Sequence, residues 1–236
     1  VPLRPVSSST RWGAEATVRI THIGYGRVGG ALAGAFLRAG HDVTLAATTA
    51  NPEGAAQARD ADPALADARV APTSDAVADA DLVVLAVPFP VVDAVLASLA
   101  PALAGRVVID ATNPVGHGLT HGLQSRASGA EHVAALLPGA HIVKAFSVYG
   151  FEDLRQAPVG PAGMRPVIPI AGDDVAAKAT VASLLDGLGW ESVDAGGLAA
   201  AVDLEHLTLF WVRMVRGGGQ DPHLVWAALR TGSARD

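Results

Sequence analysis

The sequence contains no cysteine among its 236 residues, so disulfides and thiolate metal sites are excluded. That composition agrees with a reducing compartment, and we expect a cytoplasmic protein. Charged residues make up only 17% of the chain, the formal net charge is -6, and no long basic run occurs, so we expect no nucleic-acid partner. No stretch approaches the roughly 20 unbroken apolar residues of a membrane span, and we expect no membrane partner.

Residues 1–16 also lack an apolar signal core, and the sequence predicts a flexible, polar N-terminal arm there. Apolar residues, by contrast, make up 50% of the chain. A composition this rich in apolar residues fits a parallel sheet that is buried on both faces.

The most informative stretch is the run from Thr17 to Ala39. β-Branched apolar residues predict a buried strand, the sequence Gly-Tyr-Gly-Arg-Val-Gly follows at once, and apolar residues then recur at helical spacing up to Gly40. A Gly-x-Gly-x-x-Gly motif between a strand and a helix is the fingerprint of a dinucleotide site. Gly24 allows the tight turn, Gly26 lets the backbone approach a pyrophosphate, and Gly29 lets helix and strand pack closely.

Roughly 20 residues beyond this turn, the second strand (residues 41–46) ends at the place where the adenosine ribose is expected. No Asp or Glu stands there to bind the ribose hydroxyls of NAD, and no Arg stands there for the 2′-phosphate of NADP. Thr48 and Thr49 can donate hydroxyl hydrogen bonds to a phosphate, so the sequence favours NADP over NAD. Arg27 or Arg59 could supply the positive charge.

Further strands are expected at residues 70–71, 81–87, 106–110, 141–145, 167–171 and 190–195, and helices are expected between them. A helix is also expected from residue 91 to about 100. This alternation predicts an α/β fold of the Rossmann type, a doubly wound parallel sheet over residues 17–196. Residues 197–236 are expected to form a small C-terminal helical cap or dimerisation segment. It would comprise a long apolar helix and a last short helix from Asp221, and we expect a homodimer.

In such a sheet, ligands lie at the carboxyl ends of the strands. Three segments that follow strands are expected to meet there: Val87-Pro88-Phe89, Asn113-Pro114 and Phe146-Ser147.

Several motifs occur together in one order: Gly24 to Gly29, Asp110-Ala111-Thr112-Asn113-Pro114, Val143-Lys144-Ala145-Phe146, Ile170 to Asp174, Val193 to Gly196, and Leu204-Glu205. This set resembles the NADPH-dependent reductases of the deazaflavin coenzyme F-420, and it is similar to the reductase domain of the STEAP metalloreductases. The resemblance implies NADP as cofactor and coenzyme F-420 as possible co-substrate.

The same resemblance implies a role for each matching residue. It assigns the pyrophosphate to Gly24, Tyr25, Gly26, Arg27 and Val28. It places Val87, Pro88 and Asn113 at the nicotinamide. The second, substrate-binding pocket would be lined by Phe89, Pro114, Phe146, Ser147 and Leu207. The chain departs from the family at Ala47 to Thr49, where Ser-Arg is usual, and at Ser147, where Asn is usual.

Hydride transfer between two rings needs little acid–base help, so no catalytic side chain is assigned and no metal site is expected. If the acceptor were a carbonyl or an imine, a proton donor would be needed, and the candidates are Lys144, Tyr149 and His206, with His117 and His121 on a glycine-rich loop. Each has a structural alternative, such as an ion pair for Lys144 or a packing role for His206.

The leading hypothesis is a hydride transfer between NADP(H) and coenzyme F-420. The alternatives are an NAD(P)H-dependent reductase of a small organic carbonyl, an imine or a flavin on the same fold, and a sensor that binds NADP without turnover.

Overall fold

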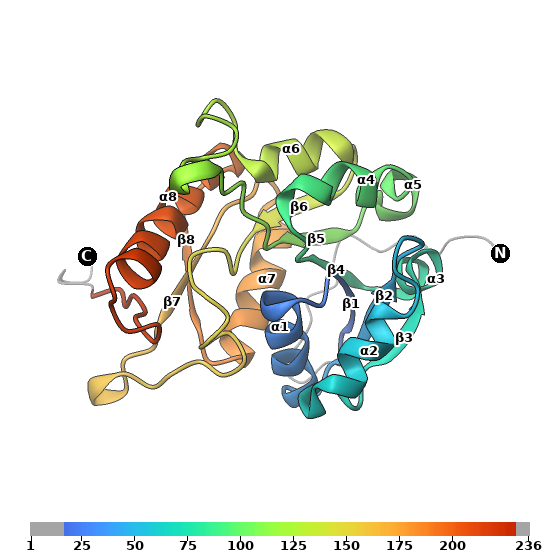
Figure 1. The fold of residues 1–236 in the computed structure, drawn as a ribbon, viewed down its shortest axis with the longest axis horizontal. Helices are drawn as coiled ribbons and strands as arrows, with labels where there is room; N and C mark the ends of the chain where they lie inside the picture. The colour runs from blue at the N-terminus through green and yellow to red at the C-terminus, as the bar shows by residue number, and fades with distance from the viewer. Residues whose placement is uncertain (1–16, 230–236) are drawn as a thin grey trace.

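The structure of the protein is a computed structural model that describes residues 17–229 (Figure 1). The N-terminal arm expected at residues 1–16 lies outside the described residues.

A parallel sheet forms the centre of the molecule (Figure 1). Its strands stand in the order β3-β2-β1-β4-β5-β6, and every neighbouring pair is parallel. The strands are β1 (Arg19–Ile23), β2 (Asp42–Ala47), β3 (Arg69–Pro72), β4 (Leu82–Leu85), β5 (Val107–Asp110) and β6 (His141–Lys144). The chain order reverses between β1 and β4, which is the topological switch point of a doubly wound sheet. The Rossmann-type fold expected from the sequence is confirmed.

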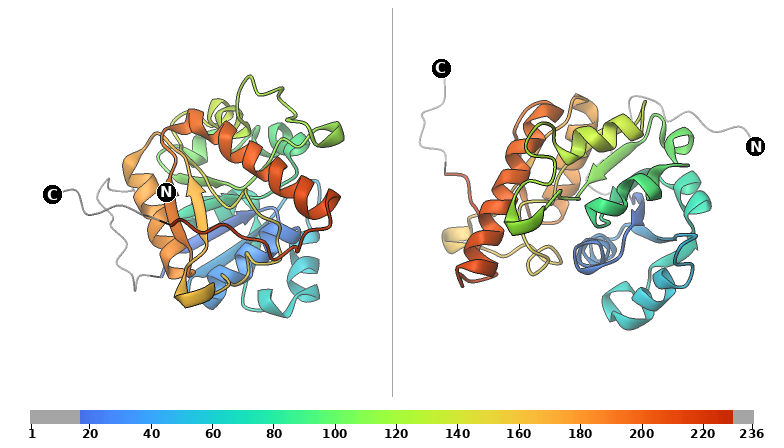
Figure 2. Two further views of the ribbon diagram at one scale, coloured as in Figure 1. Left: turned by 90° about the vertical axis from the view of Figure 1, so that its left-hand side faces the viewer. Right: turned by 45° about the horizontal axis from the view of Figure 1, so that its top comes forward.

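Helices lie on both sides of this sheet (Figure 2). They are α1 (Arg27–Arg38), α2 (Gly54–Ala61), α3 (Thr73–Asp79), α4 (Val92–Leu96), α5 (Ala100–Leu103), α6 (Gly129–Leu136), α7 (Val175–Gly187) and α8 (Ala201–Val212). Central strands such as β4 are buried along their whole length, which explains their unbroken apolar sequence. None of the helices between residues 17 and 229 combines the length and apolar character needed to cross a bilayer.

The structure corrects two elements expected from the sequence. The helix expected from residue 91 to about 100 is divided into α4 and α5, because Pro101 lies in the first turn of α5 and proline cannot donate a backbone hydrogen bond inside a longer helix. The short helix expected from Asp221 is absent. Instead, the carbonyl of Trp226 accepts a hydrogen bond from the backbone N–H of Val167, so this segment lies along a strand edge.

The last two strands, β7 (Val167–Ile170) and β8 (Glu191–Asp194), form a separate two-stranded parallel sheet. This small sheet joins the main one through an antiparallel bridge between Ala171 and Lys144 at the end of β6. Helix α8 continues into a π-helical turn at Arg213–Gly217 and lies over this side of the molecule, in red in Figure 1.

His22 is fully buried in β1, and neither of its ring nitrogens has a hydrogen-bond partner among the described residues. Its ring lies 5.7 Å from that of Phe36 on α1. Burial disfavours the charged imidazolium and lowers the pKa of His22 to about 3.

This buried histidine predicts acid sensitivity of the fold. Between pH 6.5 and 3 the unfolded chain binds more protons than the folded one, so stability is full above pH 6.5 and falls as the pH drops, by about 1.4 kcal/mol per pH unit. Denaturant unfolding at pH 7.5 and pH 5 measures this loss. In His22→Leu, the loss between the two pH values is expected to be about 2 kcal/mol smaller than in the wild type. An unchanged difference would contradict a buried neutral His22.

Candidate functional site

The glycine turn lies where β1 and β4 are adjacent, and its shape excludes side chains at two positions. Gly24 has a left-handed backbone with φ of +100°, and a Cβ atom there would lie 2.5 Å from the carbonyl oxygen of Ala86. A Cβ atom at Gly29 would lie 2.1 Å from the carbonyl oxygen of Gly24. The turn can therefore close against β4 only with glycine at both positions.

Gly26 differs from Gly24 and Gly29, because nothing lies within 4 Å of the place where its Cβ atom would be. It is the N-cap residue of α1, and no side chain caps that helix. The open space and the uncapped N–H groups fit a pyrophosphate, which is stabilised by such a helix end. The residues present thus fit a bound dinucleotide, and Gly24 to Val28 would hold its phosphates.

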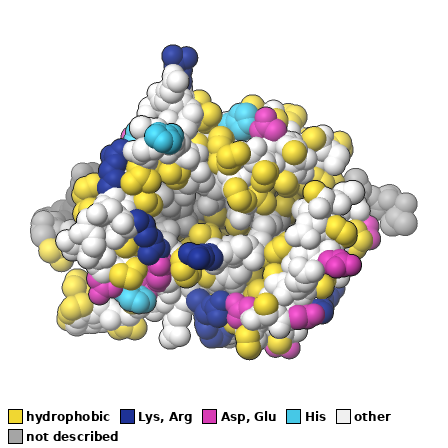
Figure 3. Space-filling view, in the orientation of Figure 1, with side chains coloured by type: hydrophobic (Ala, Val, Ile, Leu, Met, Phe, Trp, Pro, Cys, Tyr) yellow, Lys and Arg dark blue, Asp and Glu magenta, His cyan; other side chains and the backbone are white. Residues whose placement is uncertain are grey.

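A pocket of about 460 Å³ lies beside this turn. Gly26, Arg27 and Gly30 line it from α1, and Phe151 and Arg155 line it from the segment after β6. The guanidinium of Arg27 lies 5.3 Å from the centre of the Phe151 ring, and it forms no ion pair within residues 17–229. Figure 3 shows a hollow near the middle of this face of the molecule, with hydrophobic and basic side chains at its rim.

Four segments that follow strands lie side by side at the carboxyl edge of the sheet. Backbone hydrogen bonds join Ala86 to Ile23, Ala111 to Leu85, and Ala145 to Asp110. The residues expected at the nicotinamide are partly accessible there, since Val87 and Asn113 are half-buried and Pro88 is exposed. The side-chain amide of Asn113 donates to the carbonyl of Ser147 over 3.0 Å, which ties the β5 and β6 segments together.

The residues expected in the second pocket divide into two groups. Phe89 and Leu207 are half-buried, whereas Pro114, Phe146 and Ser147 are buried. Phe146 is only 1% exposed, and its ring packs edge-on against Phe36 of α1. The expectation that the Phe146 side chain lines an open pocket is therefore wrong: this ring belongs to the core.

Two of the possible proton donors, Lys144 and Tyr149, are engaged in contacts within the protein. The Lys144 ammonium is completely buried and contacts Asp110 and Glu205, each over 3.0 Å, and the carbonyl of Thr112. The Tyr149 hydroxyl donates to the carbonyl of Val167 over 2.6 Å, and burial raises its pKa well above the usual value.

The histidine candidates are placed differently from one another. His206 is exposed on α8 and hydrogen-bonds Ser125 over 2.9 Å. His121 is buried against Glu205, and His117 is exposed. Within residues 17–229, no group of three or more His, Asp or Glu side chains could hold a metal ion.

At the end of β2, Thr48 is half-buried and Thr49 is exposed. The Thr48 oxygen accepts a hydrogen bond from the backbone N–H of Asn51 over 3.2 Å, so its own hydroxyl hydrogen is free to donate to a ligand. Arg59 is paired with its neighbour Asp60 at 2.9 Å. Arg27 is thus the better placed of the two arginines to meet a phosphate.

The sequence did not predict that Phe151 and Arg155 line the pocket beside the glycine turn, or that Glu205 is a buried partner of Lys144 and His121. The first two lie in a segment without regular periodicity, and only the pocket reveals them. A signal for Glu205 was present, because a carboxylate at a buried position of an apolar helix requires a partner.

The fold and the glycine turn define this protein as a member of the dinucleotide-binding Rossmann class. The sequence profile of the family described as NADP oxidoreductase, coenzyme F-420-dependent, matches residues 19–114. A candidate F-420-dependent NADP reductase from Arthrobacter sp. FB24 has a structure with a TM-score of 0.73 and 30% identity, covering 86% of this chain and 95% of that one. The chain belongs to this family and is an NAD(P)-dependent oxidoreductase.

Two other proteins are similar over different extents. The hypothetical protein SMa0349 from Sinorhizobium meliloti has a TM-score of 0.67 and 28% identity, covering 79% of this chain and 87% of that one. Metalloreductase STEAP3 of Rattus norvegicus is 39% identical over 114 residues, which is 48% of this chain. The chain spans 22% of the length of that metalloreductase.

The two glycines at the start of α1 give a matched pair of tests. Gly26→Val is expected to fold normally, since its side chain meets open space, but to weaken NADPH binding by about 100-fold, or about 2.7 kcal/mol. Gly29→Ala is expected to lower the free energy of unfolding by about 3 kcal/mol or more, because its Cβ collides with the backbone. Isothermal titration and thermal melting measure both. Normal NADPH affinity in Gly26→Val would show that the phosphates lie elsewhere.

Proposed function

We propose that this protein transfers a hydride between NADP(H) and the deazaflavin coenzyme F-420. The observation that carries the proposal is the engagement of Lys144 and Tyr149, two side chains that could act as acids. All three N–H donors of Lys144 have acceptors, and the Tyr149 hydroxyl donates to a carbonyl. An acceptor that takes a hydride without a proton from the protein suits such a site.

The family membership supports the same choice of partners. When bound, the reduced nicotinamide supplies a hydride at C4, and the deazaflavin ring accepts it at C5. The residues of this chain would bind and orient the two rings and exclude water. Val87, Pro88 and Asn113 would contact the nicotinamide, and Phe89 and Leu207 the acceptor.

NADP is proposed over NAD from the contacts around β2 and α1. No carboxylate follows β2 at Ala47 to Thr49, so a 2′-phosphate meets no like charge there. Thr48 retains a free hydroxyl hydrogen, and Arg27 forms no ion pair in the described part of the chain. A homodimer and a cytoplasmic location remain predictions from the sequence; for the dimer, the half-exposed ring of Phe210 on α8 offers an apolar contact.

The reaction is tested by mixing the protein with NADPH and F-420 and following the absorption band of the oxidised deazaflavin. We expect rapid loss of this band, and a kcat/KM at least about 10-fold higher with NADPH than with NADH. Tight NADPH binding without loss of the band would contradict the proposal. Turnover with carbonyls, imines or flavins would then identify a different reductase, and binding without any turnover would identify a sensor.

The NADP preference is tested separately with the double variant Thr48→Ala, Thr49→Ala. Loss of two hydrogen bonds to a phosphate is expected to weaken NADPH about 10-fold while NADH affinity changes little. Thr180→Ala, on the exposed side of α7, is the matched control and should bind both cofactors normally. An equal loss of affinity for NADPH and NADH would show that these hydroxyls do not bind the 2′-phosphate.

A further inference from the structure

Glu205 on α8 is a buried carboxylate with contacts to three separate segments. Its side chain is 1% exposed. It accepts from His121 Nε2 over 2.8 Å, from Lys144 Nζ over 3.0 Å, and from the backbone N–H of Gly129 over 2.9 Å. Gly129 is the first residue of α6, so a helix N-terminus also faces the carboxylate. A buried carboxylate is tolerated only with such partners, and their positions are therefore fixed by it.

The contacts of Glu205 with His121, Lys144 and Gly129 begin a buried polar network. Through Lys144, this network reaches Thr112, the residue that precedes Asn113. Lys144 contacts Asp110 Oδ2 over 3.0 Å and donates to the carbonyl of Thr112. Asp110 Oδ1 in turn accepts from the backbone N–H of Thr112 over 3.0 Å and from its hydroxyl over 2.7 Å. Thr112 is thus held on both sides, and its position determines where the Asn113-Pro114 segment begins.

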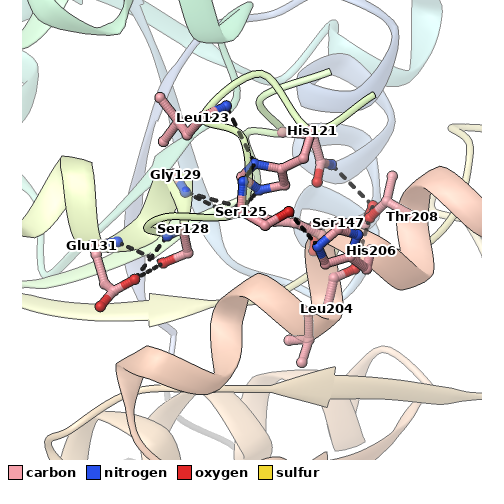
Figure 4. Close-up of polar contacts among 12 residues, drawn as sticks. His121, Leu123, Ser125, Ser128, Gly129, Glu131, Ser147, Leu204, His206 and Thr208 are labelled. Carbon is pink, nitrogen blue, oxygen red and sulfur yellow. Dashed lines mark hydrogen bonds and ion pairs between the residues drawn. The ribbon is translucent and has the colours of Figure 1, made fainter. Parts of the chain in front are cut away.

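Through His121, the network reaches the loop of residues 115–126. The ring Nδ1 accepts from the backbone N–H groups of Leu123, over 3.3 Å, and Ser125, over 3.2 Å (Figure 4). The proton of a neutral His121 ring therefore lies on Nε2 and points at Glu205. Ser125 has a left-handed backbone with φ of 57°, and its hydroxyl also contacts His206 of α8 (Figure 4). This loop is held in a strained conformation by its contacts with α8.

Gly129 is the point where Glu205 meets Phe89 of the proposed acceptor site and Pro114, which follows Asn113. A Cβ atom on Gly129 would lie 2.8 Å from Phe89 Cε2, 3.1 Å from Pro114 Cδ and 3.1 Å from Glu205 Oε1. Because Phe89 and Pro114 lie against the backbone of Gly129, which Glu205 holds, a shift of this carboxylate is expected to move both.

We propose that Glu205 is a positioning residue for the hydride acceptor: its carboxylate fixes Phe89, Pro114 and the 115–126 loop against α8. This assignment rests on the proposed function for the identity of the acceptor. It predicts that the acceptor half of the site and the start of the Asn113-Pro114 segment depend on Glu205, whereas the glycine turn that holds the phosphates does not.

The test is Glu205→Gln, which keeps the shape of the side chain and removes one of its two acceptor oxygens. Lys144 and His121 then compete for the remaining oxygen. We expect kcat with F-420 to fall by about 10- to 100-fold and KM for F-420 to rise, because small displacements of positioning groups have effects of this size. The dissociation constant of NADPH is expected to stay within about 2-fold of the wild type.

Hydrogen–deuterium exchange of the ligand-free protein gives a readout that needs no turnover. In Glu205→Gln, the amides of residues 112–115 and 121–129 are expected to exchange faster, while those of residues 26–32 keep the wild-type rate. Asp81→Asn is the matched control, since Asp81 pairs with Arg19 at the opposite edge of the sheet, and it should leave kcat and KM unchanged.

A second variant, His121→Gln, tests the proposal even if Glu205→Gln does not fold. His121→Gln keeps an N–H group toward Glu205 but has no acceptor at the position of the ring Nδ1, which accepts from Leu123 and Ser125. We therefore expect faster exchange at residues 121–126 and a higher KM for F-420, with residues 112–115 unchanged.

Wild-type kcat, KM and exchange in Glu205→Gln would overturn the proposal, as would an equal loss of NADPH affinity and of protection throughout the chain. If the wild-type protein does not reduce F-420, the proposed function has failed, and the exchange pattern alone then supports or overturns the role of Glu205 in fixing these segments.

Discussion

The close contact between the glycine turn and β4 is the constraint on which the rest of the site depends. A Cβ atom at Gly24 would lie 2.5 Å from the carbonyl oxygen of Ala86, the residue that follows β4. The turn from β1 into α1 therefore packs directly against the end of β4, and only glycine fits there. This contact places the uncapped start of α1 beside the segments that follow β4 and β5. A phosphate bound at the helix start and a ring bound at Val87 and Asn113 would then be parts of one ligand that crosses the switch point.

The two halves of the proposed site are built from different interactions. The proposed phosphate half uses backbone geometry and the helix end, and its main charged side chain is Arg27 over Phe151. The proposed acceptor half rests on a buried ionic network in which Lys144 and Glu205 join β5, β6 and α8. Because the first depends on glycines and the second on buried charges, substitutions can affect one half and leave the other intact.

Local patterns predicted the parts of this structure that depend on neighbouring residues. The glycine turn, the parallel strands and α1 follow from spacing over a few residues, because each of these elements has a characteristic periodicity. The segment after Asp221 was mispredicted as a helix, because its conformation is set by a hydrogen bond to Val167, which lies far away in the sequence. The same limit applies to the candidate site. Val87 and Asn113 are half-buried, and their place at the nicotinamide stays a prediction, whereas the burial of Phe146 depends on Phe36, which no local pattern reveals.

The central claim is that a nicotinamide and a deazaflavin meet directly at the carboxyl edge of this sheet. Single-turnover reaction of the protein with F-420 and NADPH that carries deuterium at the transferred C4 position tests it most directly, with mass spectrometry of the products. Direct transfer predicts that the deuterium appears at C5 of the reduced deazaflavin. Reduced deazaflavin that contains only hydrogen from the solvent, or no reduction at all, would contradict the account.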